Sequence, residues 1–260
     1  MLYGLYLSAA GVTANSYRQD VHANNLANAE TVGFKRDIPL FQQRLTASQE
    51  QRLAGRAGAW TDPVLEGLGG GLFVTPTAAD QSAGEAEQTG SPLDVAIEGN
   101  GYFRVAAKGQ NGPPHLTRDG RFMVDRGGYL VLSNSTAHRV LDPQGRPIQL
   151  PQGGSGQLAI GKDGSILQDN KPVATIGLFD VPDRTRLVKK GGTLLDYPDA
   201  KAVKRTEGTL HGGALERSNV DPVTELTQLM ETQRQLEANA NMIRYQDQTL
   251  QKLVEVGKIG

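Results

Sequence analysis

The chain has 260 residues, no cysteine and a formal net charge of -1. Its length suffices for one or two domains with cores of their own. The near-zero charge gives no support for binding to nucleic acid or to a membrane surface, and the lack of cysteine excludes disulfides and thiolate metal sites. No stretch approaches the roughly 20 apolar residues of a membrane-spanning helix, so we expect no membrane insertion.

The N-terminal segment predicts a helix over residues 1–28. Its positions step alternately by four and three residues, as in a coiled coil, along the seam Leu2, Leu5, Ala9, Val12, Ser16, Gln19, Ala23 and Leu26. Gly4 and Gly11 lie inside this helix, and each costs about 1 kcal/mol relative to alanine. The segment therefore needs a packed partner, and its small residues let another helix approach closely.

The same segment has an apolar run over residues 2–12 that resembles a signal peptide. The first basic residue is Arg18, after the apolar run, whereas a signal peptide carries its positive charge before it. We therefore expect a mature helix and export without a cleaved signal.

The residues after this helix predict a helix stop followed by an extended exit. Asn28 and Gly33 accept left-handed backbone, and Phe34 is placed to pack back against the helix. Residues 37–90 predict an extended connector, with a short helix within residues 38–53 after Pro39. The glycine-rich run at residues 67–71 is not a phosphate-binding loop, because no Gly-Lys-Ser/Thr follows it.

Residues 91–207 predict a central, mostly antiparallel β domain. Asp-Gly and Gly-Gly turns recur between short apolar stretches, which favours a small sandwich or barrel. We expect hairpins at residues 93–105, 116–125, 122–132 and 158–167, and one strand over residues 173–181.

The C-terminal segment predicts one long helix over residues 222–255. Asp221 is a suitable cap, and Pro222 suits the first helical position. The helix would span roughly 50 Å. Its heptad seam is apolar except at two positions expected to set the register, and comprises Leu229, Gln233, Leu236, Ala240, Ile243, Asp247, Leu250 and Val254.

Both ends of the chain thus carry coiled-coil seams, which predicts that the two helices pair. The alternative is that two ordinary amphipathic helices lie on a globular body. The overall prediction is an α+β fold with four parts: residues 1–36 (helix and exit), 37–90 (connector), 91–207 (β domain) and 208–260 (return segment and long helix).

Three groups of residues, in this order along the chain, resemble signatures of bacterial flagellar rod and hook proteins. The N-terminal group is Asn24, Asn25, Leu26, Ala27, Asn28, Thr31, Gly33, Phe34, Lys35 and Arg36. The central group includes Pro92, Leu93, Asp94, Gly99, Gly101 and Phe103, with a later Thr117-Arg118-Asp119-Gly120. The C-terminal group includes Leu215, Glu216, Ser218, Asn219 and Val220, with Asp221 where the usual form has asparagine.

The resemblance implies a structural subunit of the flagellar basal-body rod, of the proximal or distal type, that serves cell motility. It implies helical assembly with further copies and with neighbouring rod and hook subunits through the terminal helices, export through the flagellar export apparatus, and transmission of torque. The terminal helices would then order on assembly, and the seam residues would form the assembly interface.

Chemistry-bearing motifs are weak. His22, His115, His138 and His211 are scattered without metal-ligand spacing, and residues 153–157 lack the second glycine of a nucleophile elbow. We expect no enzyme activity, cofactor, metal or small-molecule ligand. Two alternatives remain: a closed coiled-coil scaffold or adhesin that displays a ligand-binding β domain, and a hydrolase with converging carboxylates in a cleft.

Overall fold

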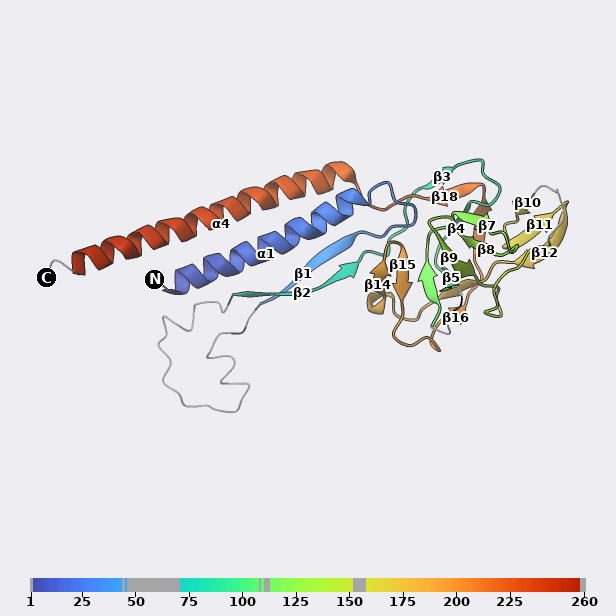
Figure 1. Ribbon diagram of the computed structural model, residues 1–260, viewed down its shortest axis with the longest axis horizontal. Helices are drawn as coiled ribbons and strands as arrows, with labels where there is room; N and C mark the ends of the chain where they lie inside the picture. The colour runs from blue at the N-terminus through green and yellow to red at the C-terminus, as the bar shows by residue number, and fades with distance from the viewer. Residues whose placement is uncertain are drawn as a thin grey trace. The chain divides into compact units, whose positions relative to one another are not determined.

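The computed structural model describes residues 2–43, 45, 71–107, 109, 113–151 and 158–257. Helix α1 (Leu2–Ala27) and helix α4 (Pro222–Gly257) stand at the two ends of the chain, with β structure between them. The two helices lie side by side in Figure 1. This order confirms the predicted α+β class. The expected glycine-rich loop at residues 67–71 falls almost wholly outside the described residues.

The strands and a short 3₁₀ helix follow the chain between α1 and α4. They are β1 (Asp37–Gln43), β2 (Leu72–Ala79), β3 (Ala86–Gln88), β4 (Val95–Glu98), β5 (Tyr102–Ala107), β6 (His115–Thr117), β7 (Phe122–Val124), β8 (Leu130–Leu132), β9 (Ser135–Val140), β10 (Leu158–Ile160), β11 (Ser165–Gln168), β12 (Lys171–Thr175), β13 (Leu178–Asp180), η1 (Arg184–Arg186), β14 (Val188–Gly191), β15 (Leu194–Asp196), β16 (Lys204–Arg205), β17 (Thr209–Gly212) and β18 (Ala214–Glu216).

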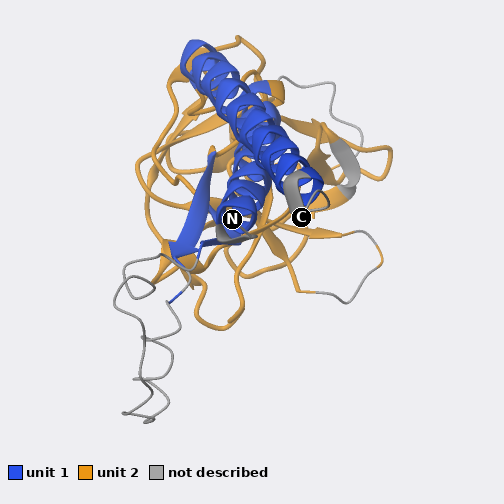
Figure 2. Cartoon of the chain, turned by 90° about the vertical axis from the view of Figure 1, so that its left-hand side faces the viewer, with its two compact units in different colours: residues 1–26, 37–78, 221–260 blue, residues 27–36, 79–220 orange. Residues whose placement is uncertain are grey.

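The chain forms two compact units, coloured separately in Figure 2. The helix unit comprises residues 1–26, 37–78 and 221–260, and the β unit comprises residues 27–36 and 79–220. The chain therefore passes from one unit to the other after residues 26, 36, 78 and 220. The exit segment that follows α1 belongs to the β unit.

In the helix unit, local chemistry starts α4 and aromatic packing holds β1 to α1. The backbone N of Val223 donates to Oδ1 of Asp221 at 3.1 Å, which confirms the predicted cap. The ring of Phe41 lies edge-on to the ring of Tyr17 at a centroid distance of 6.0 Å, and the Arg18 guanidinium lies 4.8 Å from the centre of the Phe41 ring. The Tyr17 hydroxyl donates to the carbonyl of Thr75 in β2, with which β1 pairs.

The β unit is built from antiparallel pairs. A nine-stranded sheet runs in the order β14-β15-β6-β5-β9-β8-β7, with β13 paired to β5 and β16 paired to β13. Strands β10, β11 and β12 form a smaller sheet, while β17 pairs with β4 and β18 pairs with β3.

Two apolar clusters make the core of the β unit. The larger comprises Val95, Ile97, Phe103, Val105, Phe122, Leu130, Leu132, Val140, Ile148, Leu150, Ile160, Ile166, Ile176, Leu178 and Leu210. The smaller comprises Tyr102, Leu116, Phe179, Val181, Leu187, Leu195 and Tyr197. Burial of these side chains supplies the main driving force for folding this unit.

Two of the predicted hairpins are correct and two are wrong. Strands β7 and β8 pair across the Gly127-Gly128 turn, and β10 pairs with β11. In contrast, β4 pairs with β17 rather than with β5, and β6 pairs with β5 and β15 rather than with β7. Val95, Ala96 and Ile97 are all buried, so β4 needs covering on both faces, which a two-stranded hairpin cannot provide.

Residues 37–43 form strand β1, in which Phe41 turns inward to Tyr17 while Ile38 and Leu40 alternate outward. The short helix predicted within residues 38–53 is therefore absent from residues 38–43, and the rest of that range, apart from Leu45, lies outside the described residues. The single strand expected at residues 173–181 is interrupted at Gly177, where a Cβ would lie 2.9 Å from the carbonyl carbon of Asp142.

The packing of Phe103 gives a first test. Its side chain is fully buried, and its ring centroid lies 5.0 Å from that of Phe122. We expect Phe103→Ala to lower the free energy of unfolding by about 3–5 kcal/mol, measured by urea titration with circular dichroism. Met123→Ala, at a position 37% exposed in the neighbouring β7, is the control and should change it by less than about 1 kcal/mol. Equal losses in both variants would contradict this view of the core.

Candidate assembly interface and chain junction

Close contacts between α1 and α4 join small or polar residues. They are Gly4 with Gln246, Gly11 with Asn239, and His22 with Glu225. Nδ1 of His22 lies 2.7 Å from Oε2 of Glu225, and both side chains are buried. A Cβ on Gly11 would lie 2.7 Å from Nδ2 of Asn239, so the glycine lets α4 approach closely, as the sequence indicated. The pairs show that the helices run antiparallel.

These contacts belong to one face of each helix, which we call the polar seam. Its members are Gly4, Ser8, Gly11, Asn15 and His22 of α1 with Glu225, Thr232, Asn239 and Gln246 of α4; Ser8, Asn15 and Thr232 are buried. A buried hydrogen bond of this kind contributes little net stability, because both groups also bond to water in the unfolded chain, but leaving one partner unsatisfied is costly. The polar seam is therefore suited to setting register. Its spacing on α1 is visible in the sequence, but a heptad defined by apolar residues does not include it.

On α1, each residue of the polar seam is followed directly in the sequence by a residue of the predicted apolar seam, as Gly4 is by Leu5 and Gly11 by Val12. The structure half-buries Leu5, Val12, Leu26, Leu229, Leu236, Ala240, Ile243 and Leu250, and exposes Ala9, Ala23, Gln233, Asp247 and Val254. The side chain of Leu2 lies outside the described residues. The apolar seam thus forms a flank of the helix pair and not its centre.

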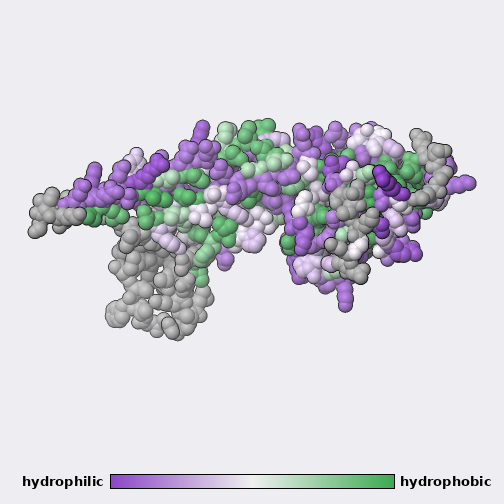
Figure 3. Space-filling view, viewed as in Figure 1, coloured by the Kyte–Doolittle hydropathy of each residue, from purple (hydrophilic) through white to green (hydrophobic). Residues whose placement is uncertain are grey.

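Further large apolar side chains on the helices are exposed and were not predicted. They are Tyr6, Leu7, Val223, Leu226, Met230, Met242, Tyr245 and Leu253. Figure 3 shows hydrophobic residues gathered along α1 beneath a hydrophilic outer edge of α4. The helix unit therefore keeps apolar surface that the described part of the chain does not cover.

The N-terminal motif residues have local structural roles. Nδ2 of Asn25, which is fully buried, donates to the carbonyl of Asp37, and the backbone N of Asp37 donates back to Oδ1 of Asn25 at 2.8 Å. Asn28 accepts from the backbone N and the hydroxyl of Thr31, which closes the turn after α1. Leu26 is half-buried, while Asn24 and Ala27 are exposed.

Gly33 and Phe34 fit the exit segment into the β unit. Gly33 has a φ of 68°, and a Cβ there would lie 2.5 Å from the backbone N of Asp119, so only glycine fits. Its backbone N donates to the carbonyl of Glu216 at 2.8 Å. Phe34 is buried with Ala29 and Val220, and Nζ of Lys189 lies 3.9 Å from the centre of its ring.

A buried carboxylate gathers the three motif groups. Glu216 Oε1 lies 2.5 Å from Nζ of Lys35 and accepts from the backbone N of Gly84, and Oε2 accepts from Nη1 of Arg118 at 2.9 Å. Nη2 of Arg118 donates to the carbonyl of Gly99 in the central motif. Each of the three charged side chains is at most 4% exposed. Sequence reasoning quoted Glu216 and Arg118 but gave them no role, because their partners are distant in the chain.

Electrostatics of this group follow from burial and charge. Burial raises the pKa of Glu216, but the charges of Arg118 and Lys35 outweigh this effect. The pKa therefore lies below its ordinary value of 4.5. Burial lowers the pKa of Lys35, and the attraction of Glu216 offsets this only in part. The group is therefore a charged cluster in a low-dielectric setting.

Asn219 ties together the segments beside it. Its Oδ1 accepts from the backbone N of Arg36 at 2.7 Å, and its Nδ2 donates to the carbonyls of Asp80 and Ser82 at 3.0 and 3.2 Å. The backbone N of Asp80 in turn donates to the carbonyl of Arg36. We call these residues together with the Glu216 cluster the clasp; its members are Lys35, Arg36, Asp80, Ser82, Gly84, Arg118, Glu216 and Asn219.

The remaining motif residues shape turns and core. Oδ2 of Asp94 accepts from the Thr89 hydroxyl at 2.6 Å, and its carbonyl accepts from the backbone N of Gly213. Gly99 and Gly101 have φ values of 85° and 135°, which L side chains rarely adopt. Pro92 is exposed, whereas Leu93 and Phe103 pack in the core. The hydroxyl of Ser218 accepts from the backbone N of Val220.

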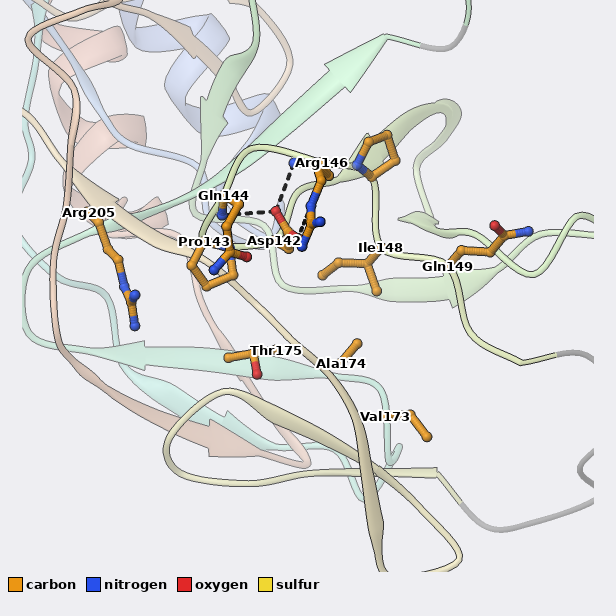
Figure 4. Close-up of a pocket in the computed structure, with 11 residues that line it drawn as sticks. Asp142, Pro143, Gln144, Arg146, Ile148, Gln149, Val173, Ala174, Thr175 and Arg205 are labelled. Atoms are coloured by element: carbon orange, nitrogen blue, oxygen red, sulfur yellow. Dashed lines mark hydrogen bonds and ion pairs between the residues drawn. The ribbon is translucent and has the colours of Figure 1, made fainter.

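The cleft in Figure 4 does not supply the carboxylate pair that a hydrolase would need. It has a volume of about 540 Å³ and lies in the β unit. Asp142 is the one acidic residue among the described residues that line it. Both its oxygens accept hydrogen bonds within its own turn, from the backbone N of Arg146 at 2.8 Å and from Nε of Arg146 at 3.0 Å. These hydrogen bonds give Asp142 a structural role in its turn.

In the described part of the chain, His115 and His138 are neighbours, and the other histidines are separate from them and from each other. His115 contacts Asp196, and exposed His211 lies 2.9 Å from Glu98. Within the described residues, no group of three potential metal ligands is present. None of the described helices combines the length and the apolar character that crossing a membrane requires.

Three family models match the chain in order. The model described as "Flagella basal body rod protein" matches residues 5–35, that described as "Flagellar hook protein FlgE/F/G D1 domain" matches residues 96–168, and that described as "Flagellar basal body rod FlgEFG protein C-terminal" matches residues 211–256. Each model covers one of the three motif groups, at least in part.

Whole-length relatives give the same picture. The chain is 35% identical to the flagellar basal-body rod protein FlgF of Caulobacter vibrioides over 242 residues, which is 92% of each chain. It is 32% identical to FlgF of Rhizobium meliloti, over 98% of each chain, and 32% identical to the flagellar basal-body rod protein FlgG of Bacillus subtilis, over 98% of this chain and 99% of the relative.

The Glu216 cluster gives a pH-dependent test. Because the pKa of Glu216 is lower in the folded state, its contribution to stability is present above about pH 4.5 and is lost as the pH falls further. We expect Glu216→Gln to lower the free energy of unfolding at pH 7 by about 3–5 kcal/mol, since it leaves two buried cations without their carboxylate. The difference from the unaltered protein should shrink as the pH falls below 4.5.

The control for this test is Glu98→Gln, which alters an exposed pair with His211. It should change stability by less than about 1 kcal/mol in urea titrations at each pH. A Glu216→Gln difference that stays constant from pH 7 to pH 3 would contradict an ionised, paired Glu216.

Proposed function

Because this chain belongs to the flagellar basal-body rod protein family, we propose that it builds the rod by packing the apolar flank of its helix pair against neighbouring subunits. The protein is a structural subunit of the basal-body rod, and it assembles there with other rod and hook subunits. No observation favours the scaffold or adhesin alternative.

The observation that carries the proposal is the division of surfaces on the helix pair. The polar seam joins α1 to the α4 of the same chain, with the buried His22–Glu225 pair at one end. The apolar seam beside it stays half-buried or exposed, up to 58% at Val254. Apolar surface left in water is a strong drive for association, and a helix flank suits a second helix.

The residues proposed for the assembly interface are those of the apolar seam. They are Leu2, Leu5, Ala9, Val12, Ala23, Leu26, Leu229, Gln233, Leu236, Ala240, Ile243, Asp247, Leu250 and Val254. Gln233 and Asp247 are exposed polar positions in it, and they would set the register between subunits. Contacts between different faces of successive copies produce a helical assembly when the rotation between copies does not close into a ring.

We further propose that the subunit transmits torque, passes through the flagellar export apparatus without a cleaved signal peptide, and has no enzymatic activity, cofactor or small-molecule ligand. The structural role of the family supports these proposals. Binding to nucleic acid is not expected from a chain of net charge -1. The ordering of the helices on assembly, and the four-part division of the chain, stay predictions.

The assembly surface is tested by placing a charge on it. We expect Val254→Asp to raise the protein concentration needed for polymer growth by at least about tenfold, because the proposed interface would then bury a carboxylate in place of an apolar side chain. Sedimentation velocity over a concentration series measures this. The change lies on the apolar flank and leaves the polar seam intact.

Asn241→Asp is the matched control, since it adds the same charge to another exposed position of α4. It should leave assembly unchanged. Equal effects of the two variants would indicate a general charge effect and sink the proposed interface, and a small closed oligomer in the unaltered protein would favour the scaffold alternative.

A further inference from the structure

The clasp joins segments at which the chain crosses between the two units. Three of the four crossings between the units follow residues 36, 78 and 220. Arg36, Asp80 and Asn219 stand within two residues of these crossings, and hydrogen bonds connect all three. These bonds are separate from the ladders of the β sheets.

Both the oxygen and the nitrogen of the Asn219 side-chain amide form hydrogen bonds at this point. Its Oδ1 accepts from the Arg36 backbone, while its Nδ2 lies within 3.2 Å of three acceptors: the carbonyl of Asp80, the carbonyl of Ser82 and, at 3.0 Å, the hydroxyl of Ser82. An amide offers an acceptor and a donor group on one short side chain, so it can join two backbone segments at once. Alanine could hold neither segment.

The buried side chains of Glu216 and Lys35 connect the same segments of the chain. Glu216 binds Lys35 before the first of these crossings and Gly84 after the second, and it comes four residues before the third. Nζ of Lys35 also donates to the carbonyl of Ser82 at 2.7 Å. Charged hydrogen bonds of this kind are stronger than neutral ones.

We propose that Asn219 and Glu216 are positioning residues that carry mechanical load, so that force entering the β unit along the chain is borne by the clasp before it reaches the sheets. Force applied to the two ends of the chain enters this unit at residues 27 and 220. To pass further, it must separate residues 27–36 from residues 216–220. The contacts that resist this are those of Glu216 and Asn219, together with the small Ala29–Phe34–Val220 cluster.

This role accounts for the contacts between the N-terminal and C-terminal motif groups, which lie outside the β sheets. A rod subunit works under load, so a junction that yields early would let the β unit unravel from its ends. The inference concerns single chains, and its test is independent of how subunits assemble.

The test is force spectroscopy on the full chain with two attachment geometries. The chain has no cysteine, so handles attach only through cysteines that are introduced. In the first geometry the cysteines are added at the two chain ends, which loads the clasp. In the second they are Ser133→Cys and Lys171→Cys, at exposed positions of the β unit outside the clasp.

We expect Asn219→Ala and Glu216→Gln to raise the rupture rate of the β unit at a given force by roughly tenfold or more in the end-to-end geometry, as for a buried polar group that loses its partner. In the second geometry the same variants should change the rate much less. Glu98→Gln should behave as the unaltered protein in both geometries. Circular dichroism shows beforehand that each variant is folded, and Asn219→Ala tests the proposal if Glu216→Gln is not.

Equal increases in both geometries would overturn the proposal, since they would indicate general destabilisation. Rupture rates unchanged by Asn219→Ala in the end-to-end geometry would overturn it as well. Either result leaves the role in rod assembly untouched, because no contact between subunits enters the measurement.

Discussion

A buried carboxylate between two cations is the constraint on which the β unit depends. Glu216 comes from the last strand, Lys35 from the exit after α1, and Arg118 from the turn that follows β6. Removing Glu216 would leave both cations without their carboxylate in a medium of low dielectric constant. The β unit is therefore defined by contacts between distant segments, and it includes residues 27–36 as an integral part.

The helix unit has two kinds of surface: a polar one that joins α1 to α4, and an apolar one that stays partly exposed. Polar and small residues bring α1 and α4 together and bury His22 against Glu225. Such contacts specify register better than they add stability. Apolar residues beside them contribute stability wherever they are covered. Those that stay exposed form the flank that we propose as the assembly interface.

The motif groups owe their residue types to backbone geometry as much as to charge. Gly33 is needed because a side chain would collide with the backbone at Asp119, and Asn25 is needed because its amide completes two backbone hydrogen bonds of Asp37. Asn219 does the same for Arg36 and Asp80. These residues sit where the chain changes from one unit to the other, so a single side chain there orders two segments.

The sequence by itself determined both helices, the cap at Asp221, two of the hairpins and the family. These features depend on residues close in the chain, whose spacing and turn chemistry act before any long-range contact forms. Only the tertiary structure decided that β4 pairs with β17, that the polar seam rather than the apolar one joins α1 to α4, and that Lys35, Arg118 and Glu216 meet. Each of these is a choice between several locally acceptable partners. The free energy of burying the whole core, with every buried charge paired, makes that choice, and no short stretch of sequence contains it.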